Sequence, residues 1–274
     1  MRPLGLLLLL DIARLAVALS VQSAPVIDDL RRLSTKQALA AVCGQASEMA
    51  GHTYTNVDVV KSSPTVCKFV IGNPKALYEN PLIAKSVGLD FAALDPAMPL
   101  SSLAAMLPVL YIADNHPEYG TLGFMLNKPT GQSLNDIKPE YKALRSRPVY
   151  LGGVQNRGNS FTMMHSKAGF PENRPFKGLP GDPLSMRLFF SPDVAMANEL
   201  CLTNDAAASD FKFFTWATVW LPKQLDLEYE KKAWLTLQAP MQAVFDDDSK
   251  AFPLWRRLAA SLPPSRLGPA PSSQ

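Results

Sequence analysis

The sequence has few residues that bind metals or form covalent cross-links. Its 274 residues include three cysteines and three histidines, and no two cysteines stand in a C-x-x-C pair. Three scattered cysteines are too few for a disulfide framework, and a structural zinc site needs closely spaced ligands, so the sequence excludes both. The histidines lie far apart and form no H-E-x-x-H motif. We therefore predict no metal site and no cofactor.

An excess of charge of one sign is also missing. The chain has 27 lysines and arginines against 24 aspartates and glutamates, which gives a net charge of +3 and no electrostatic case for a nucleic-acid partner. At 47% hydrophobic and 9% aromatic residues, the chain can bury a core, so we expect a globular protein.

The near-neutral total hides two segments of opposite charge. Residues 138–187 carry nine basic and three acidic side chains, whereas residues 188–248 carry four basic and ten acidic ones. We expect the two segments to face each other or to form a dipolar surface, and self-association through opposite faces would explain the pattern equally well. Nucleic acid is disfavoured as a partner, because no reading helix or aromatic-rich RNA motif accompanies the basic segment.

The first 23 residues are typical of a targeting segment. Arg2 precedes a short apolar run at residues 4–10, and small residues follow near position 20. The run is too short to span a bilayer, so we expect no transmembrane anchor once this segment is removed. Asp11 and Arg14 interrupt the apolar region, which leaves an organelle presequence as the alternative to a signal peptide. We favour a signal peptide and entry into the secretory pathway, with secretion and plastid import both left open.

Residues 24–107 read as an N-terminal extension that is partly helical. Apolar residues recur at helical spacing over residues 28–50, and residues 66–71 are strand-like in their Val, Phe and Ile content. Five prolines divide the second half of this extension, which we expect to wrap around the core. At the other end of the chain, the proline-rich tail at residues 263–274 is predicted to be disordered.

Residues 108–262 have a regular pattern of short strands and helices and form the expected domain. Ser191 is the expected N-cap of a helix that reaches residue 202, with Pro192 at its first position. The remaining predicted elements are strands at 109–113, 122–127, 149–151, 161–164, 186–190, 211–219 and 234–237, and helices at 221–233 and from Pro253 onward.

Several motifs in this domain resemble the AlgH/YqgE family of bacterial and plastid proteins. They are Val109-Leu110-Tyr111-Ile112, Gly123-Phe124-Met125-Leu126-Asn127-Lys128-Pro129, Pro148-Val149-Tyr150-Leu151-Gly152-Gly153, His165-Ser166, Arg187-Leu188-Phe189, Trp220-Leu221-Pro222-Lys223-Gln224-Leu225 with Glu228 beyond it, Ala233-Trp234-Leu235 and Trp255-Arg256-Arg257. The motif positions that we assign to structure are Gly123, Pro129, Gly152, Gly153, Trp220, Gln224 and Trp234. Two departures stand out: Val154 replaces the proline of Gly-Gly-Pro, and Trp216-Ala217 replaces the family's Gly-Tyr.

The resemblance implies a fold more clearly than it implies a function. It implies an α+β protein with a bifurcated β-sheet and a small barrel-like core, flanked by helices. It brings no agreed reaction, and the regulatory label of the family comes from a genetic association with alginate production.

Two local patterns suggest chemistry but fit it poorly. Residues 153–160 are one residue away from a phosphate-binding loop, yet Asn159 stands where the lysine should be, so we favour a tight turn between strands. His165 and Ser166 suggest a base and a nucleophile, but adjacent side chains of a strand point to opposite faces. We favour a strand-end histidine that bonds to the backbone, with Ser166 starting the next turn.

The best site hypothesis brings together polar residues at the ends of neighbouring strands. Asn127 either closes a strand by bonding the backbone of the following turn or joins Arg157 and His165 in one cleft, with Ser166 beside them. Such a cleft would bind a small anionic ligand. Tryptophans fall on apolar elements, so we predict that all four, Trp216, Trp220, Trp234 and Trp255, belong to the core.

Three classes of function remain. The favoured one is a noncatalytic small-ligand-binding or regulatory protein, since the sequence shows no assembled triad, metal site or phosphate loop. The alternatives are a hydrolase or transferase that uses polar residues near His165, and a nucleic-acid-linked regulator.

Overall fold

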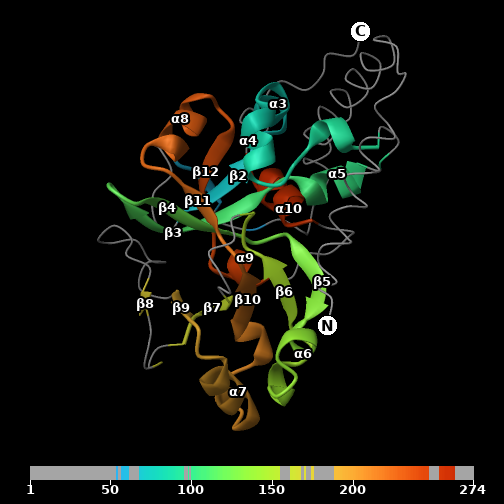
Figure 1. The fold of residues 1–274 in the computed structure, drawn as a ribbon, viewed down its shortest axis with the longest axis vertical. Coiled ribbons are helices and arrows are strands. Elements are labelled where there is room, and N and C mark those ends of the chain that lie inside the picture. The colour runs from blue at the N-terminus through green and yellow to red at the C-terminus, as the bar shows by residue number, and fades with distance from the viewer. Residues whose placement is uncertain are drawn as a thin grey trace, which may run out of the picture.

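The computed structural model describes residues 54, 57–61, 68–95, 98, 100–154, 161–167, 170, 174–175, 188–246 and 253–262. These residues form two six-stranded sheets, which lie one above the other along the long axis of the molecule (Figure 1). The predicted targeting segment, the helix at residues 28–50 and the C-terminal tail lie outside the described residues.

The upper sheet has the strand order β1-β12-β2-β3-β4-β11, and all of its pairings are antiparallel. Its strands are β1 (Asp58–Val59), β2 (Phe69–Gly72), β3 (Val109–His116), β4 (Gly120–Met125), β11 (Thr218–Trp220) and β12 (Trp234–Gln238). The predicted hairpin at residues 109–127 is present as β3 and β4.

The lower sheet has the strand order β5-β6-β10-β7-β9-β8. Its strands are β5 (Pro129–Ser133), β6 (Pro148–Leu151), β7 (Phe161–His165), β8 (Arg174–Pro175), β9 (Phe189–Ser191) and β10 (Phe211–Thr215). Strand β10 lies parallel to β6 and antiparallel to β7. The predicted pair β6 and β7 is therefore separated by a strand from later in the chain.

Helices cover the outer ends of both sheets (Figure 1). Those in the upper half are α3 (Pro74–Glu79), α4 (Pro81–Ser86), η2 (Phe91–Ala93), α5 (Leu100–Met106), α8 (Gln224–Glu230) and α10 (Leu254–Ala260). Those of the lower half and the middle are α6 (Leu134–Ile137), η3 (Lys142–Leu144), α7 (Val194–Leu202), η4 (Ala208–Asp210) and α9 (Gln242–Phe245).

Helix α7 begins later than the sequence pattern indicates. Its N-cap is Asp193, whose side chain accepts a hydrogen bond from the Met196 backbone N–H at 3.0 Å. Ser191, the predicted N-cap, instead ends β9 and accepts from the backbone N–H of Asp193 at 3.1 Å. A carboxylate at the N-cap also compensates the positive end of the helix, which favours this start.

The two sheets branch from each other at Gly152. Its carbonyl accepts hydrogen bonds from Met125 N–H at 2.8 Å and from the Thr218 hydroxyl at 3.1 Å, both of which belong to the upper sheet or its border. Its own N–H donates to the Thr215 carbonyl of the lower sheet at 2.8 Å. We call residues 152–154 and 215–218 the sheet junction, because the chain passes from the lower to the upper sheet at residues 215–218 and Gly152 and Gly153 lie against that crossing.

The predicted single strand at residues 211–219 is wrong. The chain instead forms β10 in the lower sheet and β11 in the upper sheet, with a break at Trp216 and Ala217. Trp216 has a φ of 62°, in the left-handed region, which turns the chain out of the first sheet. A run of strand-forming residues can serve two sheets, and only the packing decides where it bends.

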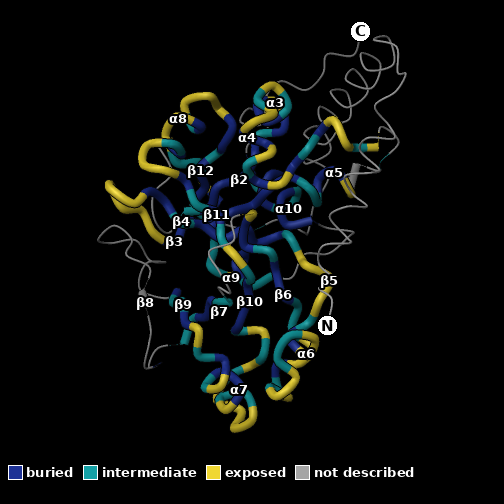
Figure 2. The backbone as a smooth tube through the Cα atoms, viewed as in Figure 1, coloured by how far each residue is buried: buried dark blue, intermediate teal, exposed yellow. Residues whose placement is uncertain are grey.

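The N-terminal extension is part of the core and does not merely wrap around it. Strand β2 lies between β12 and β3, and all four of its residues are buried. Residues of α3, α4 and α5 share one hydrophobic cluster with β3, β12 and α10 (Figure 2). Our expectation of a wrapping segment was therefore wrong, because Phe69, Val70 and Ile71 fill an interior place in the upper sheet.

The α+β class is confirmed, and the branching of the sheet is visible at the junction. Among the described residues, each sheet has two end strands and neither closes into a barrel. A second, smaller cluster of apolar side chains lies in the lower half, around Phe211, Phe213 and α7. The molecule therefore has two connected cores, and the sheet junction lies between them.

Candidate functional site

Asn127 holds two strands in place and has its polar atoms occupied. It is 1% exposed, and its side-chain oxygen accepts from Val109 N–H at 2.9 Å. Its amide nitrogen donates to the carbonyls of Leu107 at 2.8 Å and Ala105 at 3.3 Å. We predicted that Asn127 bonds the backbone of the turn after it. It bonds instead the backbone that leads into β3.

His165 is fully buried at the end of β7, where three phenylalanine rings surround it. Its ring centroid lies 4.2 Å from that of Phe170, 5.7 Å from that of Phe189 and 6.0 Å from that of Phe211. Its Nδ1 accepts a hydrogen bond from Lys167 N–H at 3.2 Å. This is the expected strand-end histidine that bonds to the backbone, and half-buried Ser166 follows the strand.

The structure does not bring Asn127 and His165 together. The strand register aligns Pro129 of β5 with Tyr150 of β6. Through Phe214 of β10, Tyr150 is in turn aligned with Thr162 of β7. The two residues are thus three strand spacings apart and displaced by five residues along parallel strands, which amounts to about 20 Å. Arg157 lies outside the described residues.

The tryptophan motif builds a buried cradle for one carboxylate. The indole N–H groups of Trp220 and Trp234 both donate to Glu228 Oε2, at 3.0 and 2.8 Å. Gln224 donates to Glu228 Oε1 at 2.9 Å and accepts from Leu221 N–H at 2.9 Å. Glu228 is 5% exposed. The structural role predicted for Trp220, Gln224 and Trp234 has a direct physical basis, because a buried carboxylate needs such donors.

Glycines of the resemblance motifs allow close approach of backbones at the sheet junction. A Cβ on Gly152 would lie 2.5 Å from the carbonyl oxygen of Trp216, and one on Gly153 would lie 2.1 Å from the carbonyl carbon of Ala217. On β4, a Cβ on Gly123 would lie 3.0 Å from the Trp220 ring. These positions therefore have no room for a side chain.

Trp216 differs from the other three tryptophans, which corrects our placement of all four in the core. Trp220, Trp234 and Trp255 are at most 1% exposed, whereas Trp216 is 36% exposed. Its positive φ costs about 1–2 kcal/mol for a residue with a Cβ. The physical reason is the crossing between sheets, where the family's glycine would fit without strain and this chain places tryptophan.

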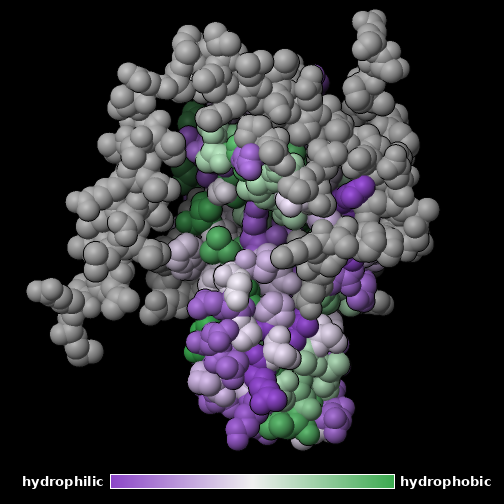
Figure 3. All heavy atoms as spheres, turned by 90° about the vertical axis from the view of Figure 1, so that its right-hand side faces the viewer, coloured by the Kyte–Doolittle hydropathy of each residue, from purple (hydrophilic) through white to green (hydrophobic). Residues whose placement is uncertain are grey.

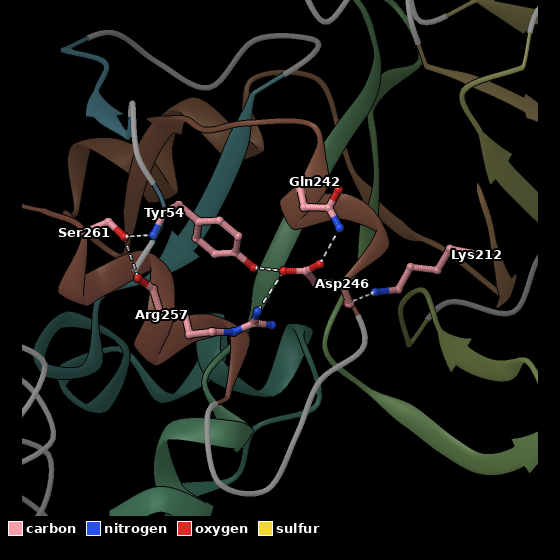
Figure 4. A network of polar contacts seen from close by, with 6 residues as sticks. All are labelled: Tyr54, Lys212, Gln242, Asp246, Arg257 and Ser261. Atoms are coloured by element: carbon pink, nitrogen blue, oxygen red, sulfur yellow. Dashed lines mark hydrogen bonds and ion pairs between the residues drawn. The ribbon is translucent and has the colours of Figure 1, made fainter. Parts of the chain in front are cut away.

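A network of polar contacts ties three distant parts of the chain together (Figure 4). The Asp246 carboxylate accepts from Tyr54 OH at 2.6 Å, from Gln242 at 2.9 Å and from Arg257 Nη1 at 2.8 Å. The backbone carbonyl of Asp246 accepts from Lys212 Nζ at 2.9 Å, and that ammonium lies 4.1 Å from the ring centroid of Tyr150. Lys212 is fully buried. No sequence pattern predicts this network, because its members are far apart in the chain.

Asp246 makes stability depend on pH. Burial alone would raise the pKa of its carboxyl, but hydrogen bonds from Tyr54 and Gln242 and the charge of Arg257 outweigh it and hold the pKa below its ordinary value of 3.8. A depressed pKa contributes stability that is fully present above pH 3.8 and is lost as the pH falls through the lower, folded-state pKa.

We therefore expect Asp246→Asn to lower the free energy of unfolding by about 2 kcal/mol at pH 7, because Arg257 loses its partner. Urea denaturation measured from pH 7 to pH 3 should show the gap to the unmodified protein narrowing only at the acidic end. Asp58→Asn is the matched control, since Asp58 is exposed. An equal gap at every pH would show that the Asp246 carboxylate contributes nothing through its charge.

The basic and acidic segments of the sequence are neighbours in the lower half. Strand β7 of the basic segment pairs with β10 of the acidic one, and Lys167 forms an ion pair with Asp210 at 3.0 Å. The Arg147 side chain donates to the Phe211 carbonyl at 3.3 Å. Figure 3 shows the lower end of the molecule, where hydrophilic residues lie beside hydrophobic ones. The two segments are therefore adjacent in the lower sheet, while a dipolar surface or self-association stays a prediction.

Within the described residues, Cys201 is the cysteine whose surroundings can be assessed. Burial raises the pKa of the Cys201 thiol, Asp210 raises it further and Lys167 lowers it in part, so the thiolate form is disfavoured. No group of three or more metal-ligating side chains occurs within the described ranges. Among the helices in those ranges, none is long and apolar enough to cross a membrane.

Comparison with known proteins identifies the family. The family model described as AlgH-like, DUF179, matches residues 107–265. The chain belongs to this AlgH-like family. A UPF0301 protein of Paraburkholderia phytofirmans is 29% identical over 160 residues, which cover 56% of this chain and 76% of the relative. A UPF0301 protein of Chlorobaculum tepidum is 25% identical over 177 residues, covering 63% and 89%.

Two solved structures are also similar to this AlgH-like chain. The AlgH protein of Pseudomonas aeruginosa, solved in solution, has a TM-score of 0.44 at 23% identity and covers 76% of this chain and 93% of its own. Protein DIP2367 of Corynebacterium diphtheriae has a TM-score of 0.46 at 16% identity and covers 74% and 95%. The family match begins at residue 107, so β2 and helices α3 to α5 of this AlgH-like protein precede it.

Proposed function

We propose that this AlgH-like protein is a noncatalytic small-ligand-binding or regulatory protein. The observation that carries the proposal is the burial of His165, the base on which a hydrolase or transferase reaction would depend. A general base must come within hydrogen-bond reach of the proton that it removes. His165 has no exposed surface and is surrounded by three phenylalanines, so a substrate cannot reach it without rearrangement of the lower core.

The other polar residues that could do chemistry serve the scaffold. Asn127 holds the start of β3, Glu228 accepts two indole N–H groups, and Lys212 bonds the Asp246 carbonyl. Side chains bonded in this way stabilise the fold. We therefore expect their removal to lower the free energy of unfolding and not to act on a chemical step.

We place the ligand at the end of the lower sheet that carries the sheet junction. Val154 precedes the segment that contains Arg157, and Phe161, which follows that segment, pairs with Thr215 on β10. Both neighbours of the segment thus lie beside the junction. In this proposal Arg157 supplies the positive charge for a small anionic ligand, while Asn127 and His165 have structural roles.

Native mass spectrometry of the purified full chain tests the proposal. We expect a co-purified small molecule that adds a defined mass and that raises the unfolding temperature when it is added back to stripped protein. Arg157→Ala should weaken its binding about tenfold or more, because a charge-assisted contact is lost. Arg145→Ala is the control, since Arg145 is exposed near the opposite end of the sheet.

Two results would contradict the proposal. One is turnover of a substrate in a broad hydrolase and transferase panel that disappears in His165→Ala while the fold is retained. The other is a shift in gel mobility with nucleic acid that weakens steeply with salt, which would favour the nucleic-acid-linked alternative.

A further inference from the structure

Opposite charges lie side by side at the lower end of the molecule. Residues 138–147, which contain η3, carry four basic and one acidic side chain, and residues 193–205, which contain α7, carry three acidic and no basic ones. The two stretches are in contact, because the Asn198 side chain of α7 accepts a hydrogen bond from Ala143 N–H of η3 at 3.0 Å. This end of the molecule therefore has a basic side and an acidic side whose net charges are equal and opposite.

The outer face of α7 lies between these charges. Ala195, Glu199 and Leu202 are exposed and recur at helical spacing, so they share one face of the helix (Figure 2). Leu202 comes four residues after Asn198 and lies on the side of the helix next to η3, whereas Glu199 is turned from Asn198 by about 100°. The order across the surface is therefore exposed Lys142 of η3, then Leu202, then Glu199.

The charges on the two sides of this face do not pair within the molecule. In the part of the chain that the structure describes, Lys142 and Glu199 form no ion pair with each other or with another residue. A two-fold axis through Leu202 would place the basic side of one molecule over the acidic side of another, because an isologous interface joins the same patch of both copies. The charge pattern of this face is thus complementary to itself.

We infer that α7 and η3 form the docking surface for a second copy of this chain, with Leu202 at its centre and reciprocal ion pairs between Lys142 and Glu199 at its rim. An apolar centre and a polar rim are typical of protein–protein interfaces. The charges fix the orientation of the two copies, and salt weakens their attraction. The inference gives the predicted self-association a surface, and it does not depend on the proposed ligand site at the sheet junction.

Sedimentation velocity of the full chain over a range of concentrations tests the inference. We expect a monomer–dimer equilibrium with a dissociation constant in the micromolar range. Raising the NaCl concentration from about 0.05 to 0.5 M should weaken the association, because screening acts on the rim charges. A chain that stays monomeric up to about 1 mM overturns the inference.

Charge reversal separates the reciprocal ion pairs from an effect on folding. Lys142→Glu and Glu199→Lys should each weaken the dimer about tenfold or more, because like charges then face each other across the axis. The double variant should recover most of the affinity, since it restores both ion pairs with their signs exchanged. Lys231→Glu is the matched control, because Lys231 is exposed at the C-cap of α8 in the upper half, and it should leave the affinity unchanged.

A second pair of variants tests the apolar centre. Leu202→Lys places two ammonium groups at the axis and should abolish the dimer, while a lysine suits the C-terminal end of α7. Leu227→Lys is the control, since Leu227 of α8 has the same 56% exposure as Leu202. All variants should keep the circular dichroism spectrum and nearly the urea midpoint of the unmodified protein, because the changed side chains are exposed. A dimer that Leu202→Lys leaves intact, or a double charge variant without recovery, overturns this surface.

Discussion

Glu228→Ala is expected to lower the free energy of unfolding by about 4 kcal/mol. The substitution leaves the indole N–H groups of Trp220 and Trp234 without their acceptor, and both side chains are only 1% exposed. Each buried donor left unsatisfied costs about 1–3 kcal/mol, and hydrogen bonds to a charged group are at the strong end of that range. Urea denaturation at pH 7, followed by tryptophan fluorescence, measures the loss.

Two further variants show whether the cradle itself is responsible. Glu228→Gln keeps an acceptor oxygen for the two indole N–H groups and should cost only about 1–2 kcal/mol, because only the hydrogen bond from the Gln224 amide, which then faces an NH2 group, is lost. Glu230→Ala changes an exposed carboxylate on the same helix and should stay within about 0.5 kcal/mol of the unmodified protein. Equal losses in Glu228→Ala and Glu230→Ala would show that the indole contacts contribute nothing.

Gly153→Ala should disrupt the sheet junction and cost at least about 3 kcal/mol. The new Cβ would lie 2.1 Å from the carbonyl carbon of Ala217 and 2.2 Å from the nitrogen of Thr218, both of which are backbone atoms. Neither strand can move away freely, because β10 and β11 are each paired in a sheet. The measurement is the urea midpoint together with the yield of folded protein.

Gly131→Ala is the matched control for the junction glycine. Gly131 has a φ of 81° but nothing within 4 Å of a Cβ, so alanine there suffers only the backbone strain of about 1–2 kcal/mol. A loss in Gly153→Ala no larger than in Gly131→Ala would mean that the junction has room for a methyl group. The difference between the two variants therefore measures the close approach of the backbones.

Local sequence patterns predicted individual elements well where each apolar run forms one strand of one sheet. The alternation and turn residues around Gly120 predicted the β3–β4 hairpin, and apolar runs predicted β6, β7 and β12. The pattern did not predict that β10 lies between β6 and β7, because strand order depends on contacts between distant residues. It also joined β10 and β11 into one strand, since a change of sheet at Trp216 leaves no mark on hydrophobicity.

For the candidate site too, the sequence predicted the roles of single residues but not which residues come together. The structural role of Trp220, Gln224 and Trp234 followed from the motif, but their common partner Glu228 needed the fold to bring all four together. His165 was predicted to bond the backbone, and it does. Its proximity to Asn127 was inferred from strand ends alone, but the two residues lie three strands apart and at opposite ends of those strands.

The sequence alone determined the class of this protein: an α+β domain of the AlgH-like family in which Gly152, Gly153, Trp220 and Trp234 have structural roles. It also predicted the strand that became β2, because Phe, Val and Ile favour an extended chain. Only the tertiary structure decided that β2 lies inside the upper sheet, that Asp246 gathers Tyr54 and Arg257, and that Trp216 is exposed while three other tryptophans are buried. The physical reason is that burial and hydrogen bonding belong to pairs of residues that are distant in the chain, and their partners are chosen only when the two sheets meet.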